Sequence, residues 1–221
     1  MTDRHSRADE PEIVVDPVER AKLEARNALE QFDAVIAVVE EFTGPERRPF
    51  RLRASIILQL QRIALKGLSA YAGVFRPAGV DIGGSRHKPV EAYLVPTRIE
   101  EMCDYVTDNW SKPPIHLTAY VLWRLNWIHP FTDGNGRTAR AVAYLVLCVR
   151  LGYRLPGTKT IPELIAADKD PYYAALESAD AGDLSVLERL LAALLAMQLY
   201  DIHRVAIEGN GDPGSDDRTF H

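Results

Sequence analysis

Hydrophobic residues recur every three or four positions through most of this chain, which is the pattern of amphipathic helices. The first run covers residues 18–42, ends at Thr43-Gly44-Pro45, and carries the apolar positions Leu23, Ala28, Leu29, Phe32, Val35, Ile36 and Val39. The same spacing predicts further helices at about 54–68, 96–109, 115–128, 136–151, 171–181 and 184–205. We therefore expect a mostly helical protein.

One stretch has strand character instead. Residues 72–77 lead into Val80-Asp81-Ile82, and the following residues 83–89 are rich in glycine, serine and proline. This order predicts a short hairpin centred near residues 83–88. The expected fold is all-α, a helical bundle with one small β-hairpin.

The polarity of the chain also suggests how it is divided. Residues 1–17 are polar and predict a flexible N-terminal arm, and residues 18–50 predict a helical extension. Residues 51–206 form the expected core domain, and the Gly-, Pro- and Asp-containing residues 207–221 predict a disordered tail.

Composition narrows the class of protein. The 221 residues are 47% hydrophobic and 26% charged, as in a globular domain, and the net charge of −5 comes with no long basic run, so we expect no direct nucleic-acid binding. Cys103 and Cys148 resemble reduced core residues. The longest apolar run, residues 141–149, is too short to cross a membrane, and residues 1–10 lack the apolar segment of a signal peptide. We expect a cytoplasmic protein with no membrane partner, and its oligomeric state, a homo-oligomer included, stays open.

The strongest chemical signal lies in twelve consecutive residues. They read His129, Pro130, Phe131, Thr132, Asp133, Gly134, Asn135, Gly136, Arg137, Thr138, Ala139 and Arg140. A predicted helix ends before them, Pro130 prevents its simple continuation, and a nearly all-apolar helix follows. Unpaired N–H groups and the helix dipole make such a helix N-terminus a site for phosphate.

The side chains in this segment suit the same chemistry. Arg137 and Arg140 lie on one face of the first helical turn, and arginine binds phosphate in a bidentate manner. Asp133 offers a hard oxygen ligand for Mg²⁺, and His129 titrates in the range of a general base. Each residue alone could cap a helix or pair with a surface carboxylate, whereas their combination favours phosphate chemistry.

The segment resembles the complete Fic-family signature, H-P-F-x-[D/E]-G-N-G-R-x-x-R, without a departure. Residues 72–76 with residues 82–87 resemble the strand and target-docking flap of that family, and residues 172–176 with 182–184 resemble its C-terminal helices. The similarity covers roughly residues 51–197.

The resemblance implies a protein adenylyltransferase, which transfers AMP from Mg²⁺-ATP to a Tyr, Thr or Ser hydroxyl of a target protein. His129 would deprotonate that hydroxyl, Asp133 would hold Mg²⁺, and residues 134–136 would form an anion hole. Arg137 and Arg140 would bind the β- and γ-phosphates. Alternatives are removal of AMP, another nucleotide or phosphate transfer, and a non-catalytic interaction module.

Two further features concern specificity. The family's flap would hold a target segment by strand addition, and here it corresponds to Ile82, Gly83, Gly84, Ser85, Arg86 and His87. The kinase branch of the family has lysine at the position of Gly136, so the glycine favours AMP transfer over phosphorylation.

An internal inhibitor is also suggested by the resemblance. Many members carry a helix with the pattern [S/T]-x-x-x-E-[G/N], whose glutamate pairs with the second signature arginine. Residues 26–31 match it only at Glu30, since Arg26 and Gln31 occupy the flanking positions. The hypothesis is that Glu30 contacts Arg140 and lowers activity; the alternative is a solvated helix residue.

Overall fold

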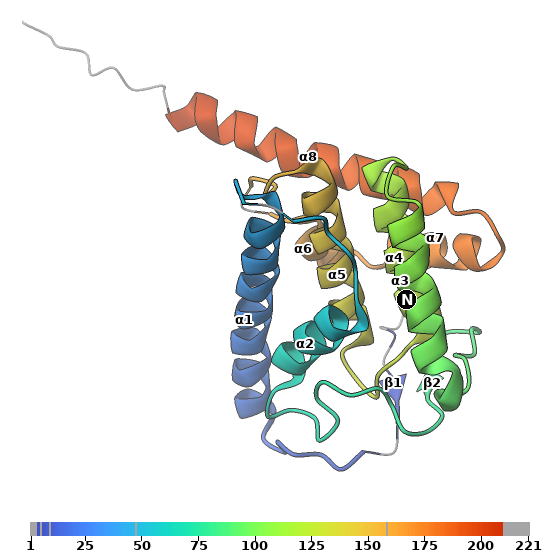
Figure 1. Cartoon of the computed structure of the whole chain (residues 1–221). Helices are drawn as coiled ribbons and strands as arrows, with labels where there is room; N and C mark the ends of the chain where they lie inside the picture. Colours follow the sequence, from blue (N-terminus) through green and yellow to red (C-terminus); the bar gives the residue numbers. More distant parts are fainter. Residues whose placement is uncertain (1–3, 5, 9, 47, 158, 210–221) are drawn as a thin grey trace, which may run out of the picture.

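The computed structural model describes residues 4, 6–8, 10–46, 48–157 and 159–209 (Figure 1). Its helices are α1 (Pro17–Thr43), α2 (Ala54–Leu65), α3 (Val95–Asp108), α4 (Pro114–Ile128), α5 (Asn135–Leu151), α6 (Ile161–Ala167), α7 (Asp170–Asp180) and α8 (Ser185–Gly209), with a 3₁₀ turn η1 (Ala92–Leu94). The strands are β1 (Ser6–Arg7) and β2 (Asp81–Ile82). The mostly helical fold is confirmed, and the expected disordered tail lies outside the described residues from residue 210 onward.

Helix α5 forms the centre of the bundle. Every residue from Ala141 to Val149 is buried, and α1, α2, α4 and α6 all contact this helix (Figure 1). A helix that is apolar on all sides buries its whole surface, so its N-terminus at Asn135 starts inside the protein rather than at its edge. The phosphate-binding site predicted at this N-terminus is therefore enclosed by other parts of the protein.

Helix α1 belongs to the same core. Its Asn27 and Gln31 are buried and donate hydrogen bonds to the backbone carbonyls of Lys66 (2.8 Å) and Leu60 (3.1 Å), at the C-terminal half of α2 and just beyond it. Buried amides need such partners, and here they fix α1 along α2. The N-terminal extension thus packs as part of the bundle.

The predicted hairpin is wrong. Strand β2 pairs antiparallel with β1, so that Ser6 lies opposite Ile82 and Arg7 opposite Asp81. Within residues 83–91 the structure shows a turn, in which Ser85 N donates to Ile82 O over 3.2 Å, followed by irregular chain. Glycine disfavours a strand and Pro89 has no N–H to donate, so residues 83–90 form a loop and the distant N-terminus supplies the pairing strand.

Over the part of the chain that is described, no helix has the length and apolar character needed to cross a membrane.

Candidate active site

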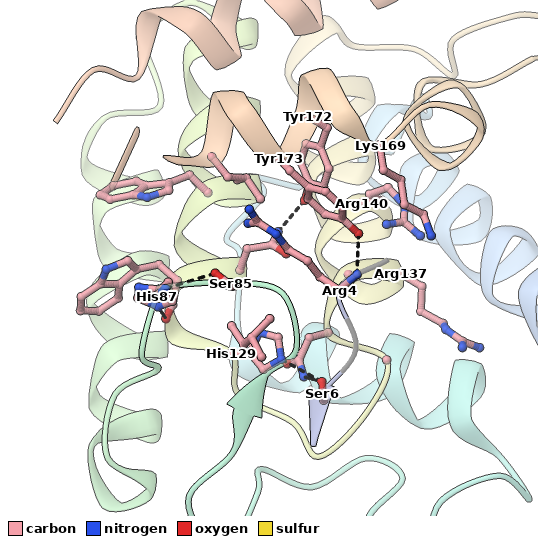
Figure 2. A pocket seen from close by; sticks show the side chains of 18 of the residues that line it. Arg4, Ser6, Ser85, His87, His129, Arg137, Arg140, Lys169, Tyr172 and Tyr173 are labelled. Atoms are coloured by element: carbon pink, nitrogen blue, oxygen red, sulfur yellow. Dashed lines mark hydrogen bonds between the residues drawn. The ribbon is translucent and has the colours of Figure 1, made fainter. Parts of the chain in front are cut away.

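A single cavity collects residues from five parts of the chain. It opens between the end of α4, the start of α5, one face of α7, the loop after β2 and the N-terminal segment (Figure 2). All seven site residues that we predicted in the twelve-residue segment lie on it: His129, Asp133, Gly134, Asn135, Gly136, Arg137 and Arg140. Residues far apart in sequence are thereby brought to one site.

The loop between α4 and α5 is fixed by its own backbone and by Arg76. His129 closes α4 in the left-handed conformation (φ 52°, ψ 61°), with its N–H bonded to Leu125 O over 3.0 Å. Arg76 is buried and donates from Nε to His129 O (2.8 Å), while its own N–H donates to Pro130 O (2.9 Å). Arg76 is a positioning residue that the sequence did not indicate.

Asn135 holds the other end of this loop. Its Oδ1 accepts from Phe131 N over 2.9 Å, and its Nδ2 donates to Phe131 O over 2.7 Å. The same Nδ2 donates to Ser6 Oγ over 3.1 Å. The loop therefore has a fixed shape before any substrate binds.

His129 is neutral at physiological pH. Its side chain is 6% exposed, and burial lowers its pKa to about 4, against an opposing effect of the Asn126 backbone carbonyl. A neutral imidazole can accept a proton, and Nε2 faces the cavity 2.8 Å from Ser6 Oγ (Figure 2). Because Asn135 Nδ2 donates to the same oxygen, the Ser6 hydroxyl proton is free to point at Nε2.

The wall opposite His129 is basic. Arg4, Arg137, Arg140 and Lys169 line it, against two acidic residues, Asp133 and Asp180 (Figure 2). Together with the N–H groups at the start of α5, this excess of positive charge suits a polyphosphate.

The Asp133 carboxylate is placed to be a ligand of a cation that binds together with phosphate. Its side chain is 41% exposed, its Oδ1 accepts from Gly134 N (2.6 Å), and its Oδ2 lies 3.7 Å from Arg20 Nη2. Among the described residues, no group of three or more His, Cys, Asp or Glu side chains is placed to form a metal site by itself. One accessible carboxylate beside an anion site is the usual protein share of a Mg²⁺ site, because phosphates and water complete it.

The flap residues divide into two groups. Ile82, Ser85 and His87 line the cavity, and His87 Nε2 lies 2.8 Å from the Trp127 carbonyl oxygen on α4. Gly83, Gly84 and Arg86 are not among the described residues that line it. His87 is thus held against the bundle rather than solvated.

Glu30 is not brought to this site. Its side chain is 43% exposed and pairs with Arg26 of the same helix over 3.6 Å, and it is not among the described residues that line the cavity. Glu24 is the α1 carboxylate that reaches a signature arginine, with Oε1 3.6 Å from Arg137 Nη2. Six residues of α-helix place Glu30 about 120° around α1 from Glu24, which explains why the two side chains point differently.

Helix α7 contributes a set of residues that sequence reasoning missed as site residues. Lys169, at its start, and Tyr172, Tyr173, Leu176 and Asp180 all line the cavity. Tyr172 is buried, and its hydroxyl accepts from Asn126 Nδ2 of α4 over 2.8 Å. Their spacing of three and four marks one helix face, but the same spacing serves equally well for packing into a core.

Comparison with known proteins agrees with this geometry. Residues 51–147 match the model of the Fic/DOC family. The protein adenylyltransferase fic-1 of Caenorhabditis briggsae is 32% identical over 140 residues, which are 62% of this chain and 26% of that protein. The match thus spans about a quarter of the length of the curated relative.

Solved structures share the fold. Fic-1 from Caenorhabditis elegans superposes with a TM-score of 0.65 at 26% identity, over 88% of this chain and 56% of that one. The BepC protein of Bartonella tribocorum, solved with bound AMPPNP, superposes with a TM-score of 0.59 at 15% identity, over 82% of this chain and 88% of that one. The cavity residues between His129 and Arg140 fall inside the matched region, and the chain accordingly contains a Fic/DOC family domain over residues 51–147.

Proposed function

We propose that this protein transfers AMP from Mg²⁺-ATP to a hydroxyl side chain of a target protein. The observation that carries the proposal is the placement of His129, Asp133, Arg137 and Arg140 around one cavity at the N-terminus of α5. The names of the relatives as protein adenylyltransferases support it, as does the AMPPNP bound in the BepC structure.

The residues suggest how the reaction would proceed. A target hydroxyl in the place of Ser6 Oγ gives its proton to His129 Nε2 and attacks the α-phosphorus. The bond from that phosphorus to the bridging oxygen breaks, and pyrophosphate leaves. Arg137 and Arg140 would offset the charge that gathers on the leaving group, and the N–H groups of Asn135 and Gly136 at the start of α5 would face the reacting phosphate. Asp133 would hold Mg²⁺, which would further neutralise the phosphate charge.

Gly136 favours AMP transfer over γ-phosphate transfer. A Cβ at this position would lie 3.2 Å from Arg140 Nη1, tighter than an ordinary contact. A side chain here would therefore shift the Arg140 guanidinium by a few tenths of an ångström, and a lysine, as in the kinase branch of the family, would add a further cation next to it. With glycine, the backbone stays open to phosphate and Arg140 keeps its position.

ATP labelled separately at the α- and γ-phosphates, incubated with Mg²⁺, the protein and a cell lysate, tests the proposal. We expect protein-bound label from the α position and none from the γ position. His129→Ala removes the base and should reduce labelling by at least about 100-fold. Glu101→Gln, which alters an exposed ion pair with Arg98 on α3, is the matched control and should label like the unaltered protein. Label from the γ position, or full labelling by His129→Ala, would rule the mechanism out.

A further inference from the structure

The N-terminal segment of the chain lies where a target would bind. Strand β1 pairs antiparallel with β2, the strand that leads into the flap, and thereby places Ser6 opposite Ile82 on the cavity (Figure 2). Strand addition of this kind is a common way for an enzyme to hold an extended peptide. This segment precedes residues 51–147, the region that the family model matches.

Arg4 fixes the segment at a second point. Its guanidinium pairs with Glu177 of α7 and lies 4.4 Å from the centre of the Tyr173 ring, and its backbone N–H donates to the Tyr173 hydroxyl over 3.3 Å. The Arg4 side chain is only 13% exposed, whereas that of Glu177 is 59% exposed. Strand pairing on one side and α7 on the other thus hold Arg4 and Ser6 at the cavity.

Between these two points, Ser6 presents a hydroxyl in reactive geometry. Its Oγ lies 2.8 Å from His129 Nε2 and accepts from Asn135 Nδ2 over 3.1 Å. A nucleophile within hydrogen-bond distance of a neutral base, with its own lone pair oriented by a third group, is the arrangement that activates hydroxyls in group-transfer enzymes.

We propose that Ser6 is a modification site of this protein: the chain transfers AMP to its own Ser6 within one molecule. This inference rests on the proposed function and names one substrate for it. The Ser6 Oγ–Pα bond forms, the Pα–O bond to the β-phosphate breaks, the hydroxyl proton passes to His129 Nε2, and pyrophosphate leaves. The product carries AMP on the N-terminal segment.

Mass spectrometry of the full chain after incubation with Mg²⁺-ATP provides the test. We expect one AMP adduct per chain, and cleavage after Glu12 yields residues 1–12, whose only hydroxyl residues are Thr2 and Ser6. Fragmentation should place the adduct on Ser6. Ser6→Ala should lose it, Ser6→Thr should keep it, and His129→Ala should show none.

Glu177→Gln tests the role of the Arg4 contact. Loss of a partly exposed ion pair should slow formation of the adduct by about twofold to fivefold. Glu101→Gln, also at an exposed ion pair (47% against 59% for Glu177) but not on the cavity, should form the adduct at the unaltered rate. Comparing the two variants distinguishes loss of the contact that holds the N-terminal segment from a general effect of removing a surface carboxylate.

Mixing two variants tests whether the transfer is intramolecular. Ser6→Ala retains the base but lacks the acceptor, whereas His129→Ala retains the acceptor but lacks the base. We expect no adduct on either chain in the mixture, and a first-order rate constant for the unaltered protein that does not depend on its concentration. An adduct on the His129→Ala chain would overturn intramolecular transfer.

Lysate proteins in the same reaction distinguish the failure of this inference from that of the proposed function. Label from α-labelled ATP on lysate proteins, with Ser6 unmodified or with the adduct on another residue, overturns the Ser6 proposal and leaves AMP transfer standing. Absence of label on both the lysate and the chain counts against AMP transfer itself.

Discussion

At the scale of single residues, His129 links the site to the stability of the fold. Burial lowers its pKa to about 4 from an ordinary value of 6.5, so between these values the unfolded chain binds a proton that the folded chain does not. The free energy of unfolding is therefore highest, as far as His129 is concerned, above about pH 6.5, and it decreases as the pH falls towards 4. Urea denaturation at pH 7.5 and 4.5 should show the unaltered protein losing about 2–3 kcal/mol more than His129→Gln. Equal losses in the two proteins would contradict a buried neutral imidazole.

The residues that the sequence revealed are those that lie close together along it. His129, Asp133, Asn135 and the two arginines share one loop and one helical turn, so local rules of helix termini and phosphate binding find them. Ser6 and Arg4 reach the same cavity only through tertiary contacts to β2 and α7, and no local pattern marks them. The degenerate pattern indicates Glu30, whereas Glu24 of the same helix is the carboxylate that lies within ion-pair distance of Arg137.

At the scale of elements, the start of α5 depends on a close approach to α2. Gly134 has φ +74°, and a Cβ there would lie 2.3 Å from Leu65 Cδ2 at the end of α2. Gly134→Ala should cost about 2–4 kcal/mol of unfolding free energy, from the left-handed backbone and from overpacking together.

Gly152→Ala at the other end of α5 is its matched control, since Gly152 has φ +86° with nothing within 4 Å of an added Cβ. That variant should show only the backbone cost of about 1–2 kcal/mol. The two variants are compared by their denaturant midpoints. Equal losses of unfolding free energy would mean that Leu65 of α2 moves to accommodate the added methyl group.

The helices themselves were predicted within a few residues because each long one has a regular apolar face. The seven-residue α6 was missed, since fewer than two turns carry little periodicity. The hairpin failed for a different reason. Residues 81 and 82 do form a strand, but the tertiary fold determines which strand pairs with it. The partner is β1, in the N-terminal segment whose polar composition predicts a flexible arm.

At the scale of the whole molecule, the cavity needs parts of the chain beyond the matched residues 51–147. Helix α7 supplies one wall, and α8 contacts α4, α6 and α7 across the end of the bundle (Figure 1). The position of that wall thus depends on how firmly α8 is joined to the core. Glu188 of α8 bonds to His116 of α4 over 2.7 Å, and Gln198 is the buried polar residue of α8 with the most such bonds among those described.

Gln198 is fully buried on α8 and is bonded to three different parts of the chain. Its Oε1 accepts from Ile161 N over 3.0 Å, and its Nε2 donates to Pro156 O over 2.8 Å and to the Tyr144 hydroxyl over 3.2 Å. Gln198→Leu keeps the bulk but leaves the buried Ile161 N–H without its acceptor and removes the donor to the Pro156 carbonyl, so unfolding should become easier by about 1–3 kcal/mol. Met197→Ala, at a neighbouring position that is 54% exposed, should change stability by no more than about 0.5 kcal/mol. Urea midpoints with unchanged slopes measure both, and a Gln198→Leu protein as stable as Met197→Ala would show that α8 is not joined to the core through this residue.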